Sequence, residues 1–140
     1  MNLLRLALAA VGAFVAYFAV GGLAAGVPAL RSEFRKYPAV YRSQDSMKSV
    51  MPAGMIAMFF AILALAVIYA KLYHAGDGVA EGALFGALIG VFALGAFVLH
   101  NYVNLNIGLK LTLQQALIYF VEWIVVGIVI GFIYRPPAAQ

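Results

Sequence analysis

The chain has 140 residues, of which 66% are hydrophobic and 10% are charged, and its formal net charge is +4. A soluble domain is about 45–50% apolar and about 25% charged, and a short one has too little interior to hide this much apolar surface from water. The composition therefore predicts one integral membrane domain over residues 1–140. Cysteine is absent, which excludes disulfides, cysteine-ligated zinc and thiol catalysis.

Four long apolar stretches follow one another, and each exceeds the roughly 20 residues that a bilayer-crossing helix needs. We expect an all-α, four-helix membrane bundle with spans near 4–29, 50–73, 81–103 and 112–134. The first stretch is too long for the apolar part of a signal peptide, and we interpret it as a retained span. Pro52 is expected in the first turn of the second helix. Thr112 and Gln115 have capping-box spacing at the start of the fourth.

The connection at residues 31–48 mixes aromatic and basic side chains, a composition that suits the lipid headgroup layer. Pro38 argues against one continuous helix there. Five basic residues are expected to contact headgroups: Arg31, Arg35, Lys36, Arg42 and Lys48. An anchoring loop is the simpler interpretation, and a binding surface for a partner or an anionic lipid is the alternative. No pattern typical of nucleic-acid binding is present.

The basic residues also predict an orientation. If the 31–48 connection is cytoplasmic, Lys110 is cytoplasmic too, which places six basic residues inside against three outside, namely Arg5, Lys71 and Arg135. Cytoplasmic connections carry an excess of Lys and Arg. We therefore expect both termini to lie outside the cytoplasm.

Small residues recur at four-residue spacing in the last two spans. They are Gly82, Gly86 and Gly90 in the third span and Gly127 and Gly131 in the fourth. Glycines at this spacing let two backbones approach closely, which is how helices associate in lipid. Packing within one four-helix bundle is the simpler interpretation, and a homo-oligomer contact along the third span is the alternative.

Glu122 is the single formal charge of the last span and lies near its middle. A carboxyl group at that depth is costly, so it usually has a partner, a proton or a function. We expect it to be neutral at neutral pH. A hydrogen-bonded structural acid and a functional group for protons, ions or a cationic ligand are equally favoured.

Other polar residues flank the turn between the last two spans. They are His100, Asn101 and Asn104 before it and Gln114 and Gln115 after it. A hairpin folded at residues 108–109 would bring amides from both helices to the same depth, where they would fix the hairpin. The same fold would place Glu122 level with Gly95.

The sequence favours neither a cofactor nor a metal. His74 and His100 belong near opposite membrane surfaces, so one haem cannot be held by both within a monomer. His100 and Glu122 are too few ligands for a metal site. No arrangement of catalytic residues is evident.

The portion from NYVNL to VEWIVVGIVIGFIYRP resembles small four-span bacterial membrane proteins of unknown function. The matching positions are Asn101, Tyr102, Glu122, Tyr134, Arg135 and Pro136, which fall in roughly the second half of the chain. The resemblance implies a four-span architecture and a bacterial inner membrane, and it implies no activity.

Three functions are compatible with these features. The favoured one is a non-enzymatic accessory or structural component that acts through helix contacts with itself or another membrane protein. The second is a proton- or ion-coupled carrier, or an oligomeric channel, with Glu122 as the titrating group. The third is a membrane enzyme or cofactor binder that uses His100 and Glu122. A carrier needs a route to Glu122, whereas an accessory protein does not.

Overall fold

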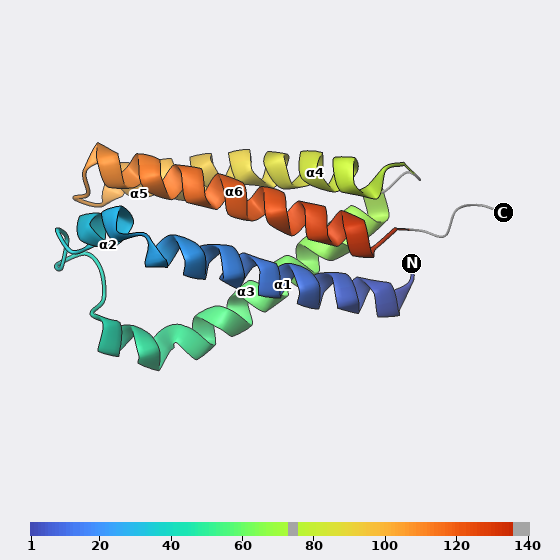
Figure 1. Cartoon of the computed structure of the whole chain (residues 1–140), viewed down its shortest axis with the longest axis horizontal. Helices are drawn as coiled ribbons and strands as arrows, with labels where there is room; N and C mark the ends of the chain where they lie inside the picture. Colours follow the sequence, from blue (N-terminus) through green and yellow to red (C-terminus); the bar gives the residue numbers. More distant parts are fainter. Residues whose placement is uncertain (73–75, 136–140) are drawn as a thin grey trace.

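The computed structural model describes residues 1–72 and 76–135. Within these residues the chain is all-α (Figure 1). Four helices are long and apolar enough to cross a membrane: Leu3–Gly26, Gln44–Leu72, Gly78–Asn104 and Leu109–Ile133. The predicted fold class and the four spans are therefore confirmed. The start of α1 and the end of α6 lie at the same end of the molecule in Figure 1, as an even number of crossings requires.

The chain order is simple. The first span is α1 (Leu3–Gly26), which is followed by the short α2 (Pro28–Phe34) and by α3 (Gln44–Leu72). The third span comprises α4 (Gly78–Ala93), the π-helical segment η1 (Leu94–Leu99) and α5 (His100–Asn104). The fourth span is α6 (Leu109–Ile133). The predicted end of the first span at residue 29 is too late, because Val27 is extended and Pro28 begins a separate helix.

Two helix starts differ from prediction because polar residues cap them earlier. The Ser43 hydroxyl accepts a hydrogen bond from the Ser46 N–H at 3.3 Å, and α3 therefore begins at Gln44. Pro52 consequently lies inside α3, and its expected place in the first turn is wrong. Asp77 accepts from the Val79 N–H at 3.1 Å, which starts α4 at Gly78.

The start of α6 is also earlier than expected. Gly108 is its N-cap residue, and no side chain caps the helix. Thr112 does not form the predicted capping box, because its hydroxyl donates to the Gly108 carbonyl at 3.2 Å. The Gly108 N–H instead donates to the hydroxyl of Tyr37 at 2.9 Å. A residue from the 31–48 connection therefore stabilises the beginning of the last span.

Glycines bring α4 and α6 into close backbone contact. A Cβ added at Gly82 would collide with the carbonyl of Gly127, and one added at Gly86 would collide with that of Trp123. A Cβ at Gly131 would likewise collide with the Gly78 carbonyl. These glycines are buried between the two antiparallel helices, so the seam is used inside the chain.

The same contacts fix the register of the α4–α6 pair. Gly86 lies opposite Trp123, and Gly90 lies opposite Phe120, whose ring carbon Cδ2 would be 2.8 Å from an added Cβ. Glu122 is therefore level with the turn between Gly86 and Gly90, and the expected pairing with Gly95 is wrong. The prediction centred the turn at residues 108–109, whereas the third span ends at Asn104 and α6 begins at Leu109, so the turn is centred earlier in the chain.

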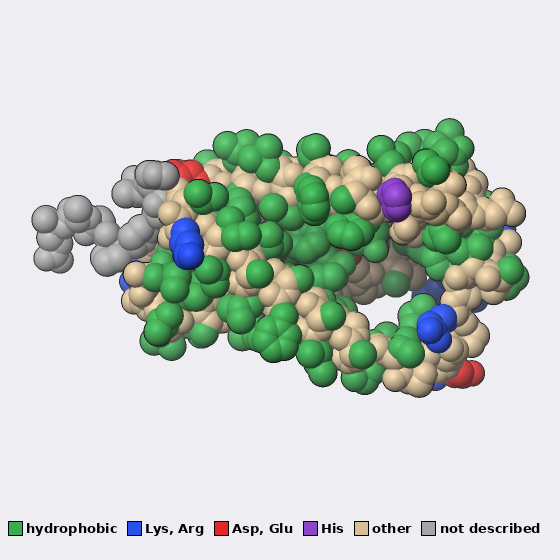
Figure 2. Space-filling model, turned by 180° about the vertical axis from the view of Figure 1, so that it is seen from behind, with side chains coloured by type: hydrophobic (Ala, Val, Ile, Leu, Met, Phe, Trp, Pro, Cys, Tyr) green, Lys and Arg blue, Asp and Glu red, His purple; other side chains and the backbone are tan. Residues whose placement is uncertain are grey.

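The core lies toward the end of the molecule that holds the termini. It combines buried residues of three helices: Leu6, Ala9, Ala10 and Ala13 of α1, Ile62, Ala66 and Tyr69 of α3, and Val126 and Ile130 of α6. The first half of α3 has no buried residue before Ile62, and it diverges from α1 in Figure 1. Figure 2 shows the resulting opening beside Lys and Arg side chains.

Candidate ligand cavity

Glu122 points from α6 toward α1 and is 4% exposed. It faces Gly21 of α1, where an added Cβ would lie 2.8 Å from the Glu122 Oε1 atom. Gly21 thus makes the space that this carboxyl group occupies. Within residues 1–72 and 76–135, no hydrogen bond or ion pair is made by the Glu122 carboxyl group. A buried acid without a protein partner is a candidate for ligand or proton binding.

Aromatic side chains surround this acid. Tyr17 of α1 and Tyr119 of α6 lie close enough to Glu122 for electrostatic interaction. The ring of Tyr17 also contacts that of Trp123, with centroids 5.5 Å apart. The Trp123 indole nitrogen is buried and has no hydrogen-bond partner among the described residues. The surroundings of Glu122 therefore contain donors that a ligand could use.

A cavity of about 690 Å³ connects Glu122 with the basic end of the molecule. Its walls come from α1, α2, the connection after α2, the start of α3 and α6. The volume lies within the range of small-molecule sites, about 300–1,000 Å³. The polar and charged residues that line it are Tyr17, Arg31, Arg35, Tyr41, Arg42, Ser43, Gln44, Gln115, Tyr119 and Glu122. The cavity thus runs from exposed arginines to a buried acid.

The three arginines that line the cavity are exposed and are not neutralised by acidic side chains. Arg31 donates to the Ala25 carbonyl at 3.2 Å, and Arg42 donates to the Ser46 hydroxyl at 3.3 Å. In the described part of the chain, neither of these nor Arg35 forms an ion pair. Most of the uncompensated positive charge of this end is therefore on the cavity, since the three lysines outside it share two carboxylates.

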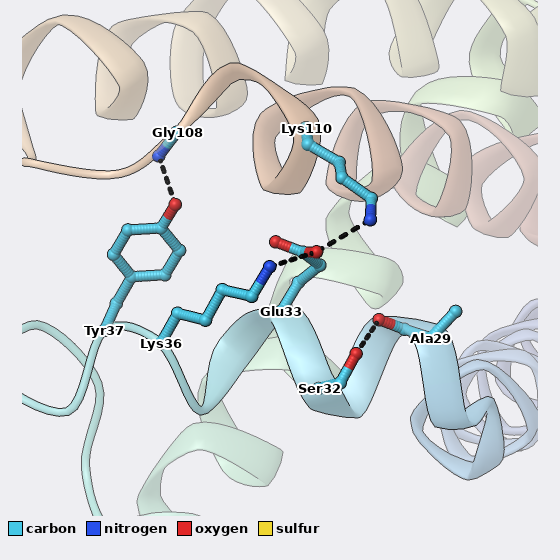
Figure 3. Close-up of polar contacts among 7 residues, drawn as sticks. All are labelled: Ala29, Ser32, Glu33, Lys36, Tyr37, Gly108 and Lys110. Carbon is cyan, nitrogen blue, oxygen red and sulfur yellow. Dashed lines mark hydrogen bonds and ion pairs between the residues drawn. The ribbon is translucent and has the colours of Figure 1, made fainter.

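The nearby lysines are arranged differently, because they lie outside the cavity and are paired. Glu33 of α2 is 3% exposed and accepts hydrogen bonds from Lys36 at 2.7 Å and Lys110 at 2.8 Å (Figure 3). Lys48 pairs with Asp45 at 3.0 Å. Through Lys110 the Glu33 carboxylate joins α2 to the first turn of α6, beside the Tyr37–Gly108 hydrogen bond.

This junction should depend on pH. The hydrogen bonds from Lys110 and then from Lys36 lower the pKa of Glu33, so its stabilising contribution is complete above about pH 4.3 and is lost as the pH falls through the lower native value. The hydrogen bond to Glu33 raises the pKa of Lys36, whose contribution is complete below about pH 10.4 and is lost above it. Because Lys36 lies just after α2, its pair with Glu33 is local, whereas the Lys110–Glu33 pair joins α2 to α6. We therefore expect α2 to dock firmly against α6 above the acidic limit.

The chain has no native cysteine, so spin labels at Ser32→Cys and Leu113→Cys, both at exposed positions, can report the α2–α6 distance. The distance distribution should be narrow at neutral pH and should broaden as the pH falls through the lowered pKa of Glu33. In Glu33→Gln the distance distribution should already be broad at neutral pH and should not change as the pH falls. A narrow distribution in acid for both proteins would show that this ion-paired junction does not hold α2.

The polar residues beside the last turn are distributed over several environments. His100, Asn101 and Asn104 are exposed, and the Asn104 amide donates to the His100 carbonyl at 2.9 Å. Gln115 donates to the Tyr41 hydroxyl at 3.2 Å. The Gln114 Oε1 atom is buried without a partner in the described structure. No hydrogen bond joins the amides of the third and fourth spans there.

The π-helical segment η1 gives a physical reason for this arrangement. A π-turn inserts a residue relative to an α-helix, which rotates the following residues by about 100° around the axis. His100, Asn101 and Asn104 all follow η1 in the chain. Their face therefore differs from the one that a regular helix would give them. Gln115 and Glu122 remain together on the cavity wall.

Sequence reasoning missed a row of methionines on α3. Met47 lines the cavity and Met58 packs against the core, and three helical turns separate them. Met51 and Met55 lie at four-residue steps between them, so all four share one side of the helix, here termed the methionine face. Flexible thioether side chains suit surfaces that adapt to varied apolar ligands. The spacing alone could have revealed this face.

Within residues 1–72 and 76–135, no group of three or more metal-ligating side chains is present. His74, one of the two histidines that could ligate a haem, lies outside the described residues. The chain matches no protein-family model, no curated protein and no solved structure. The geometry of the cavity in this small polytopic membrane protein is therefore what points to its function.

Proposed function

We propose that this chain is a non-enzymatic membrane carrier that couples binding of a ligand to a proton on Glu122. The observation that carries this proposal is the cavity that starts among exposed arginines and ends at an otherwise unpartnered acid. Acids that face a cavity inside a membrane protein commonly serve as proton relays. The core cluster closes the opposite side, which corresponds to one of the two states that alternating access requires.

Proton uptake and ligand uptake are electrically complementary in such a site. An anion that enters among Arg31, Arg35 and Arg42 would approach the carboxyl group at the far end. A protonated Glu122 removes the repulsion that a carboxylate would exert at low dielectric. Proton binding at Glu122 would therefore favour an anionic ligand, and the two would move together.

The test is proton movement into liposomes that contain the purified chain, an anionic phospholipid in the bilayer as the ligand, and an internal pH-sensitive dye. After a pH step, wild-type protein should dissipate the gradient faster than empty liposomes. Glu122→Gln preserves the size of the side chain but cannot exchange its proton at these pH values, so we expect its rate to fall at least about tenfold, a typical effect of a positioned proton-transfer group. Initial rates at equal protein content give the comparison.

The control is Glu81→Gln, which changes an acid in the first turn of α4 that does not line the cavity. It should retain the wild-type rate. Equal rates for wild-type liposomes and empty liposomes, with the protein inserted and folded, would refute the carrier function.

A second candidate function is the accessory role in a larger membrane assembly. It is favoured by the first half of α3, whose large apolar residues Met51 and Ile56 are 47% and 61% exposed. A partner helix could cover this half in place of lipid. Purification in a mild detergent should then yield a stoichiometric partner or a homo-oligomer, and a monomeric chain under all conditions would exclude this role.

The proposed location is the inner membrane of a bacterium, with both termini outside the cytoplasm. The arrangement that supports this orientation is the gathering of Arg31, Arg35, Arg42 and the paired lysines at the end opposite the termini. The accessibility of Ser32→Cys to a membrane-impermeant thiol reagent tests this orientation. Labelling in intact cells would show that the 31–48 connection lies outside the cytoplasm, which is the opposite orientation.

A further inference from the structure

We propose that the cavity holds one anionic phospholipid taken from the bilayer, with its phosphate among Arg31, Arg35 and Arg42 and one acyl chain along the methionine face of α3. This inference rests on the proposed function in treating the cavity as the ligand site, and it names the class of ligand. It can be tested by binding alone.

Charge selects the headgroup. Within the described residues, the three arginines that line the cavity form no ion pair, whereas Lys36 and Lys110 share the carboxylate of Glu33 and Lys48 pairs with Asp45. Arginine offers several N–H donors in a planar fork that matches phosphate oxygens. Basic pockets between membrane helices at the headgroup level bind anionic lipid headgroups. A zwitterionic headgroup carries its own cation, which the three arginines would repel, so it should bind less well.

The apolar part of the cavity favours the tail. Besides the arginines, the lining includes Ala24, Ala25, Leu30, Phe34, Met47 and Ile118. The methionine face continues this surface along α3 toward the core. An acyl chain has no polar groups to satisfy, and flexible methionines adapt to its changing shape. A small hydrophilic anion would leave these walls without a partner.

The position of α3 gives the lipid a way in. The first half of α3 stands away from the other helices, and Figure 2 shows the opening between them on the face seen there. In a bilayer an apolar opening at this depth is filled from the surrounding lipid. A lipid can therefore enter sideways, without leaving the membrane.

Trp123 provides a native probe of the deep end, because it is the one tryptophan of the chain and its ring contacts Tyr17 of the cavity wall. The protein is placed in phosphatidylcholine nanodiscs that contain a small fraction of brominated phosphatidylglycerol or of brominated phosphatidylcholine. Bromine on an acyl chain quenches nearby indole fluorescence. We expect phosphatidylglycerol to quench Trp123 at a much lower mole fraction than phosphatidylcholine does.

Two matched double variants locate the headgroup. Arg35→Gln with Arg42→Gln removes two positive charges from the cavity, and Lys36→Gln with Lys48→Gln removes two from the same end outside it. The arginine pair should weaken the preference for phosphatidylglycerol about thirtyfold, if each contributes as a basic residue near a membrane surface does. The lysine pair should leave most of it. Equal loss in both would show general surface attraction and overturn the proposal, as would equal quenching by both lipids.

Competition distinguishes a lipid from a soluble anion. Inorganic phosphate should not displace brominated phosphatidylglycerol, because it gains nothing from the apolar walls; complete displacement would overturn the lipid assignment. Glu122→Gln should retain the lipid preference while losing proton movement. If the wild type binds the lipid but moves no protons, the carrier function is refuted and the lipid inference stands. If the wild type moves protons but shows no lipid preference, the lipid inference is refuted and the carrier function stands.

Discussion

Gly127→Ala should separate α4 from α6 and destabilise the folded protein by about 1–3 kcal/mol or more, the range for overpacking a close contact. The added Cβ would meet the carbonyl oxygen of Gly82 and the backbone of Gly86. These are main-chain atoms of a helix, which cannot move aside as a flexible side chain can. The midpoint of unfolding by a denaturing detergent, followed by circular dichroism, measures the loss.

Gly22→Ala is the control for that variant. Gly22 also lies inside a membrane-spanning helix, and nothing lies within 4 Å of an added Cβ. Alanine is a better helix former than glycine by about 0.5–1 kcal/mol, so this change should leave stability unchanged or raise it. If Gly127→Ala were as stable as Gly22→Ala, the glycine seam would not hold the α4–α6 pair.

Gly21→Leu should close the deep end of the cavity and reduce proton movement in liposomes by at least about tenfold, as removal of the proton-transfer group itself would. Position 21 faces Glu122, and the nearest atom to an added Cβ is the Oε1 end of that side chain. The larger side chain would occupy the space beside the carboxyl group while leaving the acid in the chain. The fold should persist because the displaced atom belongs to a flexible side chain.

The neighbouring position supplies a matched comparison. Gly22→Leu introduces the same side chain one residue further along α1, where an added Cβ meets open space. It should conduct protons at the wild-type rate. Equal rates for the two leucine variants would mean that access to Glu122 does not pass Gly21.

Composition was sufficient to predict the fold class and the four spans, because apolar length is the dominant signal of a membrane helix. The ends of the helices were predicted less well. The side chains of Ser43 and Asp77 each accept a hydrogen bond from a backbone N–H, and each bond extends a helix beyond its apolar part. Such caps depend on local geometry, so the apolar boundary placed α3 too late and put Pro52 in its first turn.

The candidate site could be predicted only in part. Glu122 was evident as a charge within an apolar stretch, whereas its neighbours Tyr17 and Gly21 come from a distant helix whose rotation the sequence does not specify. The polar residues before the last turn were assigned to a face by assuming a regular helix. The π-helical segment at Leu94–Leu99 changes that face, and no short sequence pattern predicts such a segment.

The way α3 is attached has a mechanical consequence. Its contacts with the core begin at Met58, while Gln44 at its start borders the cavity. The intervening helix is a lever of about 21 Å with its fulcrum at the core. A tilt of about 10° at that fulcrum would swing the free end by about 4 Å. The glycine-packed pair of α4 and α6 would stay still as the anchor, so one moving arm is enough to widen or shut the entrance.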